Sequence, residues 1–185
     1  MATEYKEVDN RRSSSTFNLK DLVVRFLALA LTLIAAALVG LDKQTTTVAV
    51  TLVPSLPPLN VPVTAKWTHM SAFVYFVIAN SISCFYAAIS IILILATRGG
   101  HKYASLIITI LDLVVVALLF SAVGAISSVG LIAFRGNSHV QWDKVCNVLD
   151  KFCHQIAIAL FLSFAGCIAY FLLIVIGAVR LHKKL

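Results

Sequence analysis

Residues 103–134 read YASLIITILDLVVVALLFSAVGAISSVGLIAF and carry a single charged side chain, Asp112. A bilayer's hydrocarbon core is about 30 Å thick and a helix rises about 1.5 Å per residue, so about 20 mostly apolar residues make one crossing. The stretch is therefore long enough to span a membrane as one helix. Its carboxylate needs a partner, because a charge at that depth costs on the order of 2.5–3.5 kcal/mol.

Composition places the whole chain in the membrane class. Hydrophobic residues make up 60% of the chain and charged residues 12%, whereas soluble proteins average about 45–50% and about 25%. Lipid-facing backbone must be helical or form a closed barrel, and apolar runs without two-residue alternation exclude the barrel. The sequence predicts an all-α membrane protein, a four-transmembrane-helix bundle. Its expected spans are 22–41, 70–97, 104–134 and 156–179.

The basic residues predict the orientation of this bundle. They divide about two to one between the two sides, and cytoplasmic segments carry the excess of Lys and Arg. The richer side holds Lys6, Arg11, Arg12, Lys20, Arg98, Lys102, Arg180, Lys183 and Lys184, with Arg25 at its edge; the other holds Lys43, Lys66, Arg135, Lys144 and Lys151. Both termini are therefore expected in the cytoplasm, and the net charge of +7 indicates topology and attraction to anionic lipids, with no nucleic-acid partner.

Domain limits follow from this topology. We expect a disordered cytoplasmic tail at 1–20, a transmembrane domain at 21–181 with outer loops 42–69 and 135–155, and a short tail at 182–185. An alternative is that the first span is a secretory signal cleaved near 35–37, because basic residues precede it. Cleavage would leave three spans and would remove the best candidate partner for Asp112, which lies in the first span. An uncleaved anchor is therefore the preferred interpretation.

Arg25 is the expected partner of Asp112. The charge-free residues 26–41 make only about 24 Å of helix, which draws Arg25 inside the membrane boundary. Asp112 lies about 12 Å into the third span, which runs in the same direction as the first. We therefore predict an intramembrane ion pair between them. The alternatives are that Arg25 reaches lipid phosphates, and that Asp112 is protonated or bonds to a hydroxyl such as Thr109.

Small and polar residues recur at helical spacing and predict packing faces, since membrane helices associate through close contacts and interhelical hydrogen bonds. Asn80 lies on such a face of the second span. The third span has two opposite faces, one with Ser105, Thr109 and Asp112. The other is expected to contact a neighbouring subunit and comprises Ser121, Gly124, Ala125 and Ser128. A pore or substrate path along these faces is the alternative interpretation.

The outer loops differ in character. Residues 42–67 contain four prolines, too many for a helix, and are expected to be extended. Cys146 and Cys153 face an oxidising space in this topology, which predicts a disulfide. Seven residues along one helix separate Cα atoms by about 10.5 Å, beyond the roughly 7 Å that a disulfide tolerates, so the chain must bend between them. A zinc site of both cysteines with His139 and His154 is the alternative.

Sequence signatures of catalysis are absent: the chain has no nucleophile-elbow, zinc-protease, Walker or dinucleotide motif. We therefore expect no enzyme activity, catalytic residue, cofactor or metal. Residues 11–16, RRSSST, resemble a basophilic kinase site centred on Ser14, where phosphate would weaken attraction to the inner leaflet. A solvated tail without modification is the alternative.

Several motifs carry a resemblance to a known family. They are FVYFVIAN at 73–80, Asp112-Leu113, NSHVQW at 137–142, Cys146 and KFCH at 151–154. Together they resemble the CASP-like family, relatives of the plant Casparian strip membrane domain proteins. The resemblance extends from Arg25 to the fourth span, and it implies a plant plasma-membrane protein with four spans, cytoplasmic termini, an arginine in the first span and an aspartate in the third.

The family's best-known members form immobile oligomeric platforms that recruit wall-modifying enzymes. The resemblance therefore implies a non-enzymatic scaffold that forms homo- and hetero-oligomers with related four-span proteins. Its outer loops, with Asn137, His139 and Trp142, would contact secreted wall-modifying enzymes. The first outer loop lacks the Leu-Pro-Phe-Phe-like stretch of the endodermal members, which puts a role in the Casparian strip in doubt. The rival interpretations are a small transporter or channel that uses Arg25 and Asp112 as gate or relay, and an auxiliary subunit of a larger complex.

Overall fold

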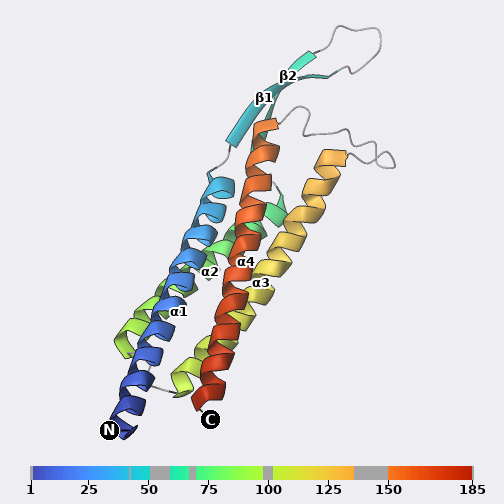
Figure 1. The fold of residues 1–185 in the computed structure, drawn as a ribbon. Helices are drawn as coiled ribbons and strands as arrows, with labels where there is room; N and C mark the ends of the chain where they lie inside the picture. The colour runs from blue at the N-terminus through green and yellow to red at the C-terminus, as the bar shows by residue number, and fades with distance from the viewer. Residues whose placement is uncertain are drawn as a thin grey trace.

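Four long helices and a β-hairpin make up the described part of the chain (Figure 1). The computed structural model describes residues 2–41, 43–50, 59–66, 70–97, 102–135 and 150–184, with the side chains of 19–41, 70–96, 103, 105–135, 151 and 153–182. The helices are α1 (Ala2–Gly40), α2 (Ser71–Thr97), α3 (Lys102–Arg135) and α4 (Asp150–Lys184). The strands are β1 (Lys43–Val50) and β2 (Leu59–Lys66).

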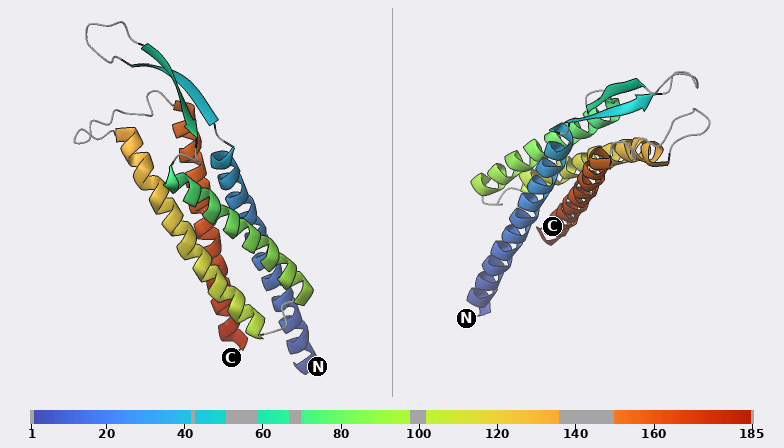
Figure 2. Two further views of the ribbon diagram at one scale, coloured as in Figure 1. Left: turned by 180° about the vertical axis from the view of Figure 1, so that it is seen from behind. Right: turned by 90° about the horizontal axis from the view of Figure 1, so that it is seen from above.

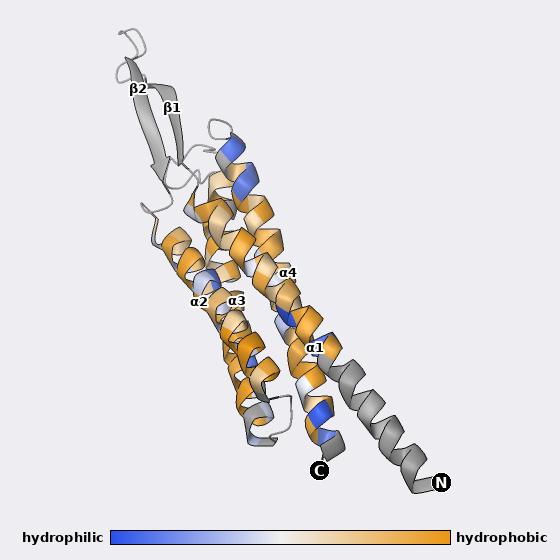
Figure 3. Cartoon of the chain, turned by 90° about the vertical axis from the view of Figure 1, so that its left-hand side faces the viewer, coloured by the Kyte–Doolittle hydropathy of each residue, from blue (hydrophilic) through white to orange (hydrophobic). Residues whose placement is uncertain are grey.

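Each helix contains a stretch long and apolar enough to cross a bilayer. These stretches are Leu19–Gly40, Ser71–Ala96, Ser105–Arg135 and Cys153–His182. Large apolar side chains cover the outside of the bundle, as in Phe85, Ile107 and Phe161, which are 70%, 55% and 72% exposed. Such a surface suits acyl chains and not water. Hydrophobic residues make up most of the length of the membrane-spanning helices (Figure 3). The predicted four-span helical bundle is confirmed.

Neighbouring helices alternate in direction around the bundle. α1 packs against α2 and α4, and α3 packs against the same two helices, so α1 faces α3 across one diagonal and α2 faces α4 across the other. Both ends of the chain lie at one end of the bundle, which we call the terminal end (Figure 2). The strands lie beyond the opposite end, which we call the hairpin end.

A β-hairpin follows the first span, where the sequence predicts an extended outer loop. β1 and β2 pair antiparallel from Lys43 opposite Lys66 to Val50 opposite Leu59. The extended character expected from the prolines is confirmed for these strands. Pro62 pairs with Thr47, and a two-stranded sheet tolerates it because proline's missing donor can lie at an open edge.

Two helices extend beyond the predicted spans. α1 begins at Ala2 and runs through most of the stretch expected to be a disordered tail, and α4 runs to Lys184. No proline or glycine lies between Ala2 and Lys20, so nothing in that stretch interrupts a helix that the first span continues. Hydropathy predicts which residues of a helix lie in the bilayer, but it does not predict how far the helix continues outside the bilayer.

The core changes character along the bundle axis. Toward the hairpin end the buried residues are apolar, including Val39, Phe76, Leu119, Ile126 and Ile156. Toward the terminal end polar and charged residues lie among buried apolar ones such as Ile91 and Ile94. The polar and charged group comprises Asp21, Arg25, Ser83, Ser90 and Asp112. The charged groups therefore lie together at one depth and one end of the bundle.

Candidate functional site

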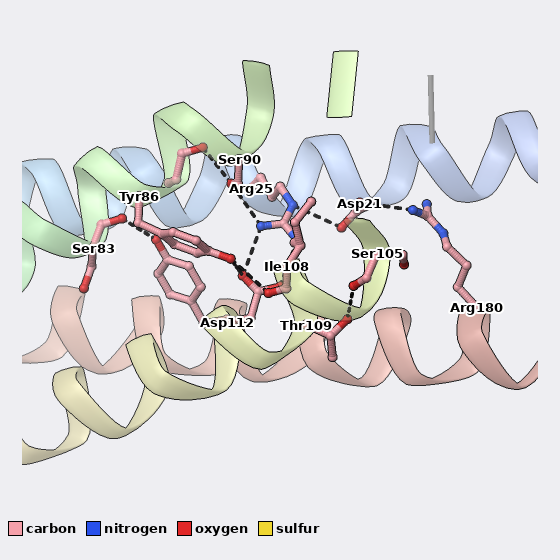
Figure 4. A network of polar contacts seen from close by, with 12 residues as sticks. Asp21, Arg25, Ser83, Tyr86, Ser90, Ser105, Ile108, Thr109, Asp112 and Arg180 are labelled. Carbon is pink, nitrogen blue, oxygen red and sulfur yellow. Dashed lines mark hydrogen bonds and ion pairs between the residues drawn. The ribbon is translucent and has the colours of Figure 1, made fainter. Parts of the chain in front are cut away.

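Arg25 of α1 and Asp112 of α3 meet across the bundle diagonal (Figure 4). The guanidinium donates two parallel hydrogen bonds to the carboxylate, Nη1 to Oδ1 at 3.1 Å and Nη2 to Oδ2 at 2.9 Å. The side chains are only 3% and 1% exposed. This forked geometry is the strongest form of an arginine–carboxylate contact. The structure thus brings together the two residues that the sequence predicts as an ion pair.

Two residues of α2 complete the bonding of this pair. Tyr86 donates its hydroxyl to Asp112 Oδ1 at 2.7 Å, and Arg25 Nη1 also donates to Ser90 Oγ at 3.0 Å. The Tyr86 hydroxyl also lies 3.0 Å from the carbonyl oxygen of Ile108. Sequence reasoning missed Tyr86, although its spacing of four residues before Ser90 places both on one helix face.

Asp21 and Arg180 extend the charged group toward the terminal end. Asp21 Oδ1 lies 3.4 Å from Arg25 Nε, and Asp21 Oδ2 lies 3.8 Å from Arg180 Nη1. Asp21 is only 4% exposed. Among the described side chains, one buried polar atom has no hydrogen bond, and it is Arg25 Nε. Asp21 interacts with this nitrogen as a counter-ion at 3.4 Å.

These four residues, Asp21, Arg25, Asp112 and Arg180, form a unit that we call the charge clasp. Two guanidinium groups balance two carboxylates, which limits the cost of burying the charges. The sequence analysis counted Arg180 only among the basic residues that predict the orientation, and it did not single out Asp21. The signal that could have found Asp21 is its i, i+4 spacing from Arg25.

The alternatives to the ion pair do not match the geometry. Arg25 directs its head group into the bundle, where Asp112 and Ser90 accept its hydrogen bonds, and not toward lipid phosphates. Thr109 donates to the carbonyl oxygen of Ser105 at 2.9 Å and not to Asp112. The carboxylate therefore accepts hydrogen bonds from three donors of two helices.

A second polar layer joins α2 and α4 across the other diagonal. Tyr170 donates to the carbonyl oxygen of Ser83 at 2.6 Å, and Ser163 donates to Asn80 Oδ1 at 2.9 Å. Asn80 is fully buried and also donates to the carbonyl oxygen of Phe76. Both diagonals of the bundle are thus bridged by buried hydrogen bonds, and Asn80 lies at a helix contact.

Comparison with known proteins bears on the whole chain. The domain described as the Casparian strip membrane protein domain matches residues 14–169. CASP-like protein 1E2 of Vitis vinifera is 57% identical over 164 residues, covering 89% of this chain and 84% of that protein. The chain belongs to the CASP-like family.

Further relatives show how widely this similarity extends among plants. CASP-like protein 1E1 of Glycine max is 52% identical, over 89% of this chain and 87% of that protein. CASP-like protein 1E1 of Arabidopsis thaliana is 44% identical, over 87% of this chain and 85% of that protein. No solved structure matches the chain. CASP-like proteins are non-enzymatic membrane proteins, which agrees with the expectation that the chain is no enzyme.

The outward face of α3 in this CASP-like protein is small and partly hydroxylated. Ser121, Gly124 and Ser128 are exposed, whereas Ala125 is half-buried. A Cβ added at Gly124 would meet no atom within 4 Å. Tyr75 of α2 donates to Ser121 Oγ at 3.2 Å along the edge of this face. The structure therefore leaves most of the predicted subunit contact uncovered on one protomer.

Glycine permits close helix contact at two places in the bundle. A Cβ built on Gly166 of α4 would lie 3.2 Å from Thr32 Cγ2 of α1, and one built on Gly177 would clash with Thr109 Oγ1 of α3. α4 therefore approaches α1 and α3 more closely than a larger residue would permit.

The remaining predicted sites fall largely outside the described residues. Cys146, His139, Asn137 and Trp142 lie there, so the disulfide, the zinc alternative and the outer-loop contacts stay predictions. Cys153 lies in the first turn of α4. Ser14 lies in α1, outside the described side chains. Cys84 and Cys167 of the spans are free thiols. Within the described residues, no group of three His, Cys, Asp or Glu side chains could hold a metal ion.

Proposed function

We propose that this CASP-like protein is a non-enzymatic plasma-membrane scaffold. It has both termini in the cytoplasm, assembles with copies of itself and related four-span proteins, and presents its outer segments to secreted wall-modifying enzymes. The observation that carries the proposal is the charge clasp, which joins α1 to α3 and α4 inside the bundle. Buried charges that balance one another favour one arrangement of the helices over looser ones, which suits a scaffold.

The apolar half of the core argues against the rival transporter or channel. Phe76, Leu119 and Ile126 are fully buried between the charge clasp and the hairpin end. A conducting path needs polar groups or water along the whole depth of the membrane. The buried polar residues nearest the hairpin end are Thr32, Asn80 and Ser163. Beyond them the described core is apolar, so its described residues form no continuous row of polar side chains across the bundle.

The outward face of α3 supports the oligomeric part of the proposal. Ser121, Gly124 and Ser128 expose small side chains and hydroxyl groups to a surface that is otherwise covered by large apolar residues. Small residues let two helix backbones approach closely, and serine hydroxyls bond across such a contact. We assign this face to a neighbouring four-span subunit.

Cross-linking tests the assignment in the full chain. Ser128→Cys, made with Cys84→Ala and Cys167→Ala to remove the free thiols of the spans, should give a covalent dimer under mild oxidation in native membranes. Ile92→Cys on α2, which is 64% exposed, is the matched lipid-facing control and should remain monomeric. Equal cross-linking at both positions, or a monomer in mild detergent without any cross-link, would contradict the proposal.

Two further measurements address the partners and the rival function. Native pull-down in mild detergent should recover copies of this chain, related four-span proteins and secreted wall-modifying enzymes. Reconstitution into proteoliposomes should give no solute or ion flux above that of empty vesicles. Flux that Asp112→Asn abolishes would establish the transporter alternative instead.

A further inference from the structure

The seam between α1 and α4 is the contact between neighbouring helices that no single connecting segment closes, either at the hairpin end, where α1–α2 and α3–α4 are linked, or at the terminal end. α2 and α3 are joined there through the short link from Thr97 to Lys102. α1 and α4 carry the two ends of the chain, so no covalent link joins them at this end (Figure 1). Among the described residues, packing between the two helices holds this seam.

Asp21 and Arg180 lie at that seam. Arg180 Nη1 lies 3.8 Å from Asp21 Oδ2, and the two side chains are 13% and 6% exposed. Each residue lies two positions inside the limit of its membrane span, Leu19 in α1 and His182 in α4. The ion pair therefore joins the two helices where they leave the apolar part of the bundle.

The same carboxylate also acts on the centre of the charge clasp. Asp21 Oδ1 lies 3.4 Å from Arg25 Nε, which has no hydrogen bond of its own, while the other two nitrogens of Arg25 bond to Asp112 (Figure 4). One carboxylate is thus shared between the seam and the interior pair.

We infer that Asp21 is a latch that closes the α1–α4 seam at the terminal end of the bundle and couples its closure to the Arg25–Asp112 pair. When the latch opens, the ends of α1 and α4 separate, and the close contact between Gly166 and Thr32 remains as the pivot. This device goes beyond the proposed scaffold function and does not depend on oligomerisation.

Distance measurements between spin labels test the latch in the full chain. Lys20 and His182 are both exposed and can each be replaced by a ketone-bearing amino acid that takes a spin label, which leaves the native cysteines unlabelled. The distance between these two labels in lipid nanodiscs measures the separation of α1 and α4 at the seam. Asp21→Asn should shift this distance distribution to longer values. A reference pair at Leu95 and Tyr103, also exposed, reports α2–α3 at the same end and should remain unchanged.

Matched variants separate the latch from general loosening. Arg180→Gln breaks the same pair from α4 and should produce the same shift, with no further shift when it is combined with Asp21→Asn. Tyr86→Phe removes a hydrogen bond from Asp112 but leaves the seam intact, so it should not change the Lys20–His182 distance. The inference is overturned if neither Asp21→Asn nor Arg180→Gln lengthens that distance, or if the reference pair lengthens equally.

Discussion

Arg25 and Asp112 are 87 positions apart in the chain, yet their side chains form a two-pronged ion pair with Nη2 at 2.9 Å from Oδ2. The pair crosses the diagonal between two helices that are not neighbours in the bundle. It can form only when α2 and α4 have brought α1 and α3 to the correct depth and rotation. The pair therefore reports the assembly of the whole bundle.

Removing Arg25 should destabilise the bundle more than removing Asp112. Arg25→Leu leaves the buried carboxylates of Asp21 and Asp112 with only Arg180 to balance them, and breaking a buried pair costs about 3–5 kcal/mol. Asp112→Leu leaves Arg25 and Arg180 to share Asp21, which lies at ion-pair distance from both. Arg25→Leu instead leaves Asp112 without its ion-pair partner, so the cost of Asp112→Leu should be smaller. Thermal unfolding of the purified variants in mild detergent measures the order.

The double variant Arg25→Leu with Asp112→Leu provides the control. It removes one positive and one negative charge and leaves Asp21 and Arg180 to pair, so it should be more stable than Arg25→Leu alone. If all three variants are as stable as the unsubstituted protein, the pair contributes nothing to folding. Exchanging the two charges should not restore stability, because an aspartate at position 25 would lie one helical turn from Asp21.

Tyr86→Phe should cost about 1.5–3 kcal/mol, the usual range for a hydrogen bond to a charged group. The Tyr86 hydroxyl lies 2.7 Å from Asp112 Oδ1 and is partly buried. Tyr75→Phe is the matched control, since its bond to Ser121 is exposed and should change the melting temperature little. If both changes have the same effect, the Tyr86 hydroxyl does not stabilise the charge clasp.

The sequence predicts some residues of this site and not others, and the difference is how deep in the membrane span each charge lies. Asp112 lies deep within an apolar run, where an isolated charge is costly, so the sequence predicts a partner and identifies Arg25. Asp21 and Arg180 lie near the span limits, where charges are common, and hydropathy therefore gives no reason to pair them. Only the three-dimensional packing of α1 against α4 brings these two side chains together.

The same limit applies to other parts of the fold. The 100° rotation per residue predicts which side of α3 faces outward, and Ser121 and Ser128 do so. The β-hairpin was not predicted, because pairing between β1 and β2 is a non-local property that prolines obscure. Tyr86 was not singled out because a tyrosine in a span is ordinary until its hydroxyl is seen to reach a carboxylate.

Two glycines of the spans should respond in opposite ways to alanine. Gly177→Ala should destabilise the protein by about 1–3 kcal/mol, the usual cost of overpacking, because the new methyl group meets Thr109. Gly124→Ala should be neutral or stabilising by up to about 1 kcal/mol, because the added group meets no atom and alanine favours the helix. Thermal unfolding compares the two, and Thr109→Ala should partly rescue Gly177→Ala. If Thr109→Ala does not rescue Gly177→Ala, the contact with Thr109 is not the cause of the destabilisation.

Single substitutions should reveal which side of the membrane each segment faces. Pro62→Thr turns Asn60 of β2 into the acceptor of an Asn-x-Thr glycosylation signal, and Arg12→Thr does the same for Asn10 near the N-terminus. Glycans are added only on the lumenal side during synthesis, so the first variant should gain a glycan and the second should not. A shift in gel mobility that is reversed by a glycosidase detects the glycan in each variant.

A glycan at Asn10 but not at Asn60 would reverse the proposed orientation and place the charge clasp near the outer leaflet. The basic residues at the terminal end make that result unexpected, because Lys and Arg are retained on the cytoplasmic side.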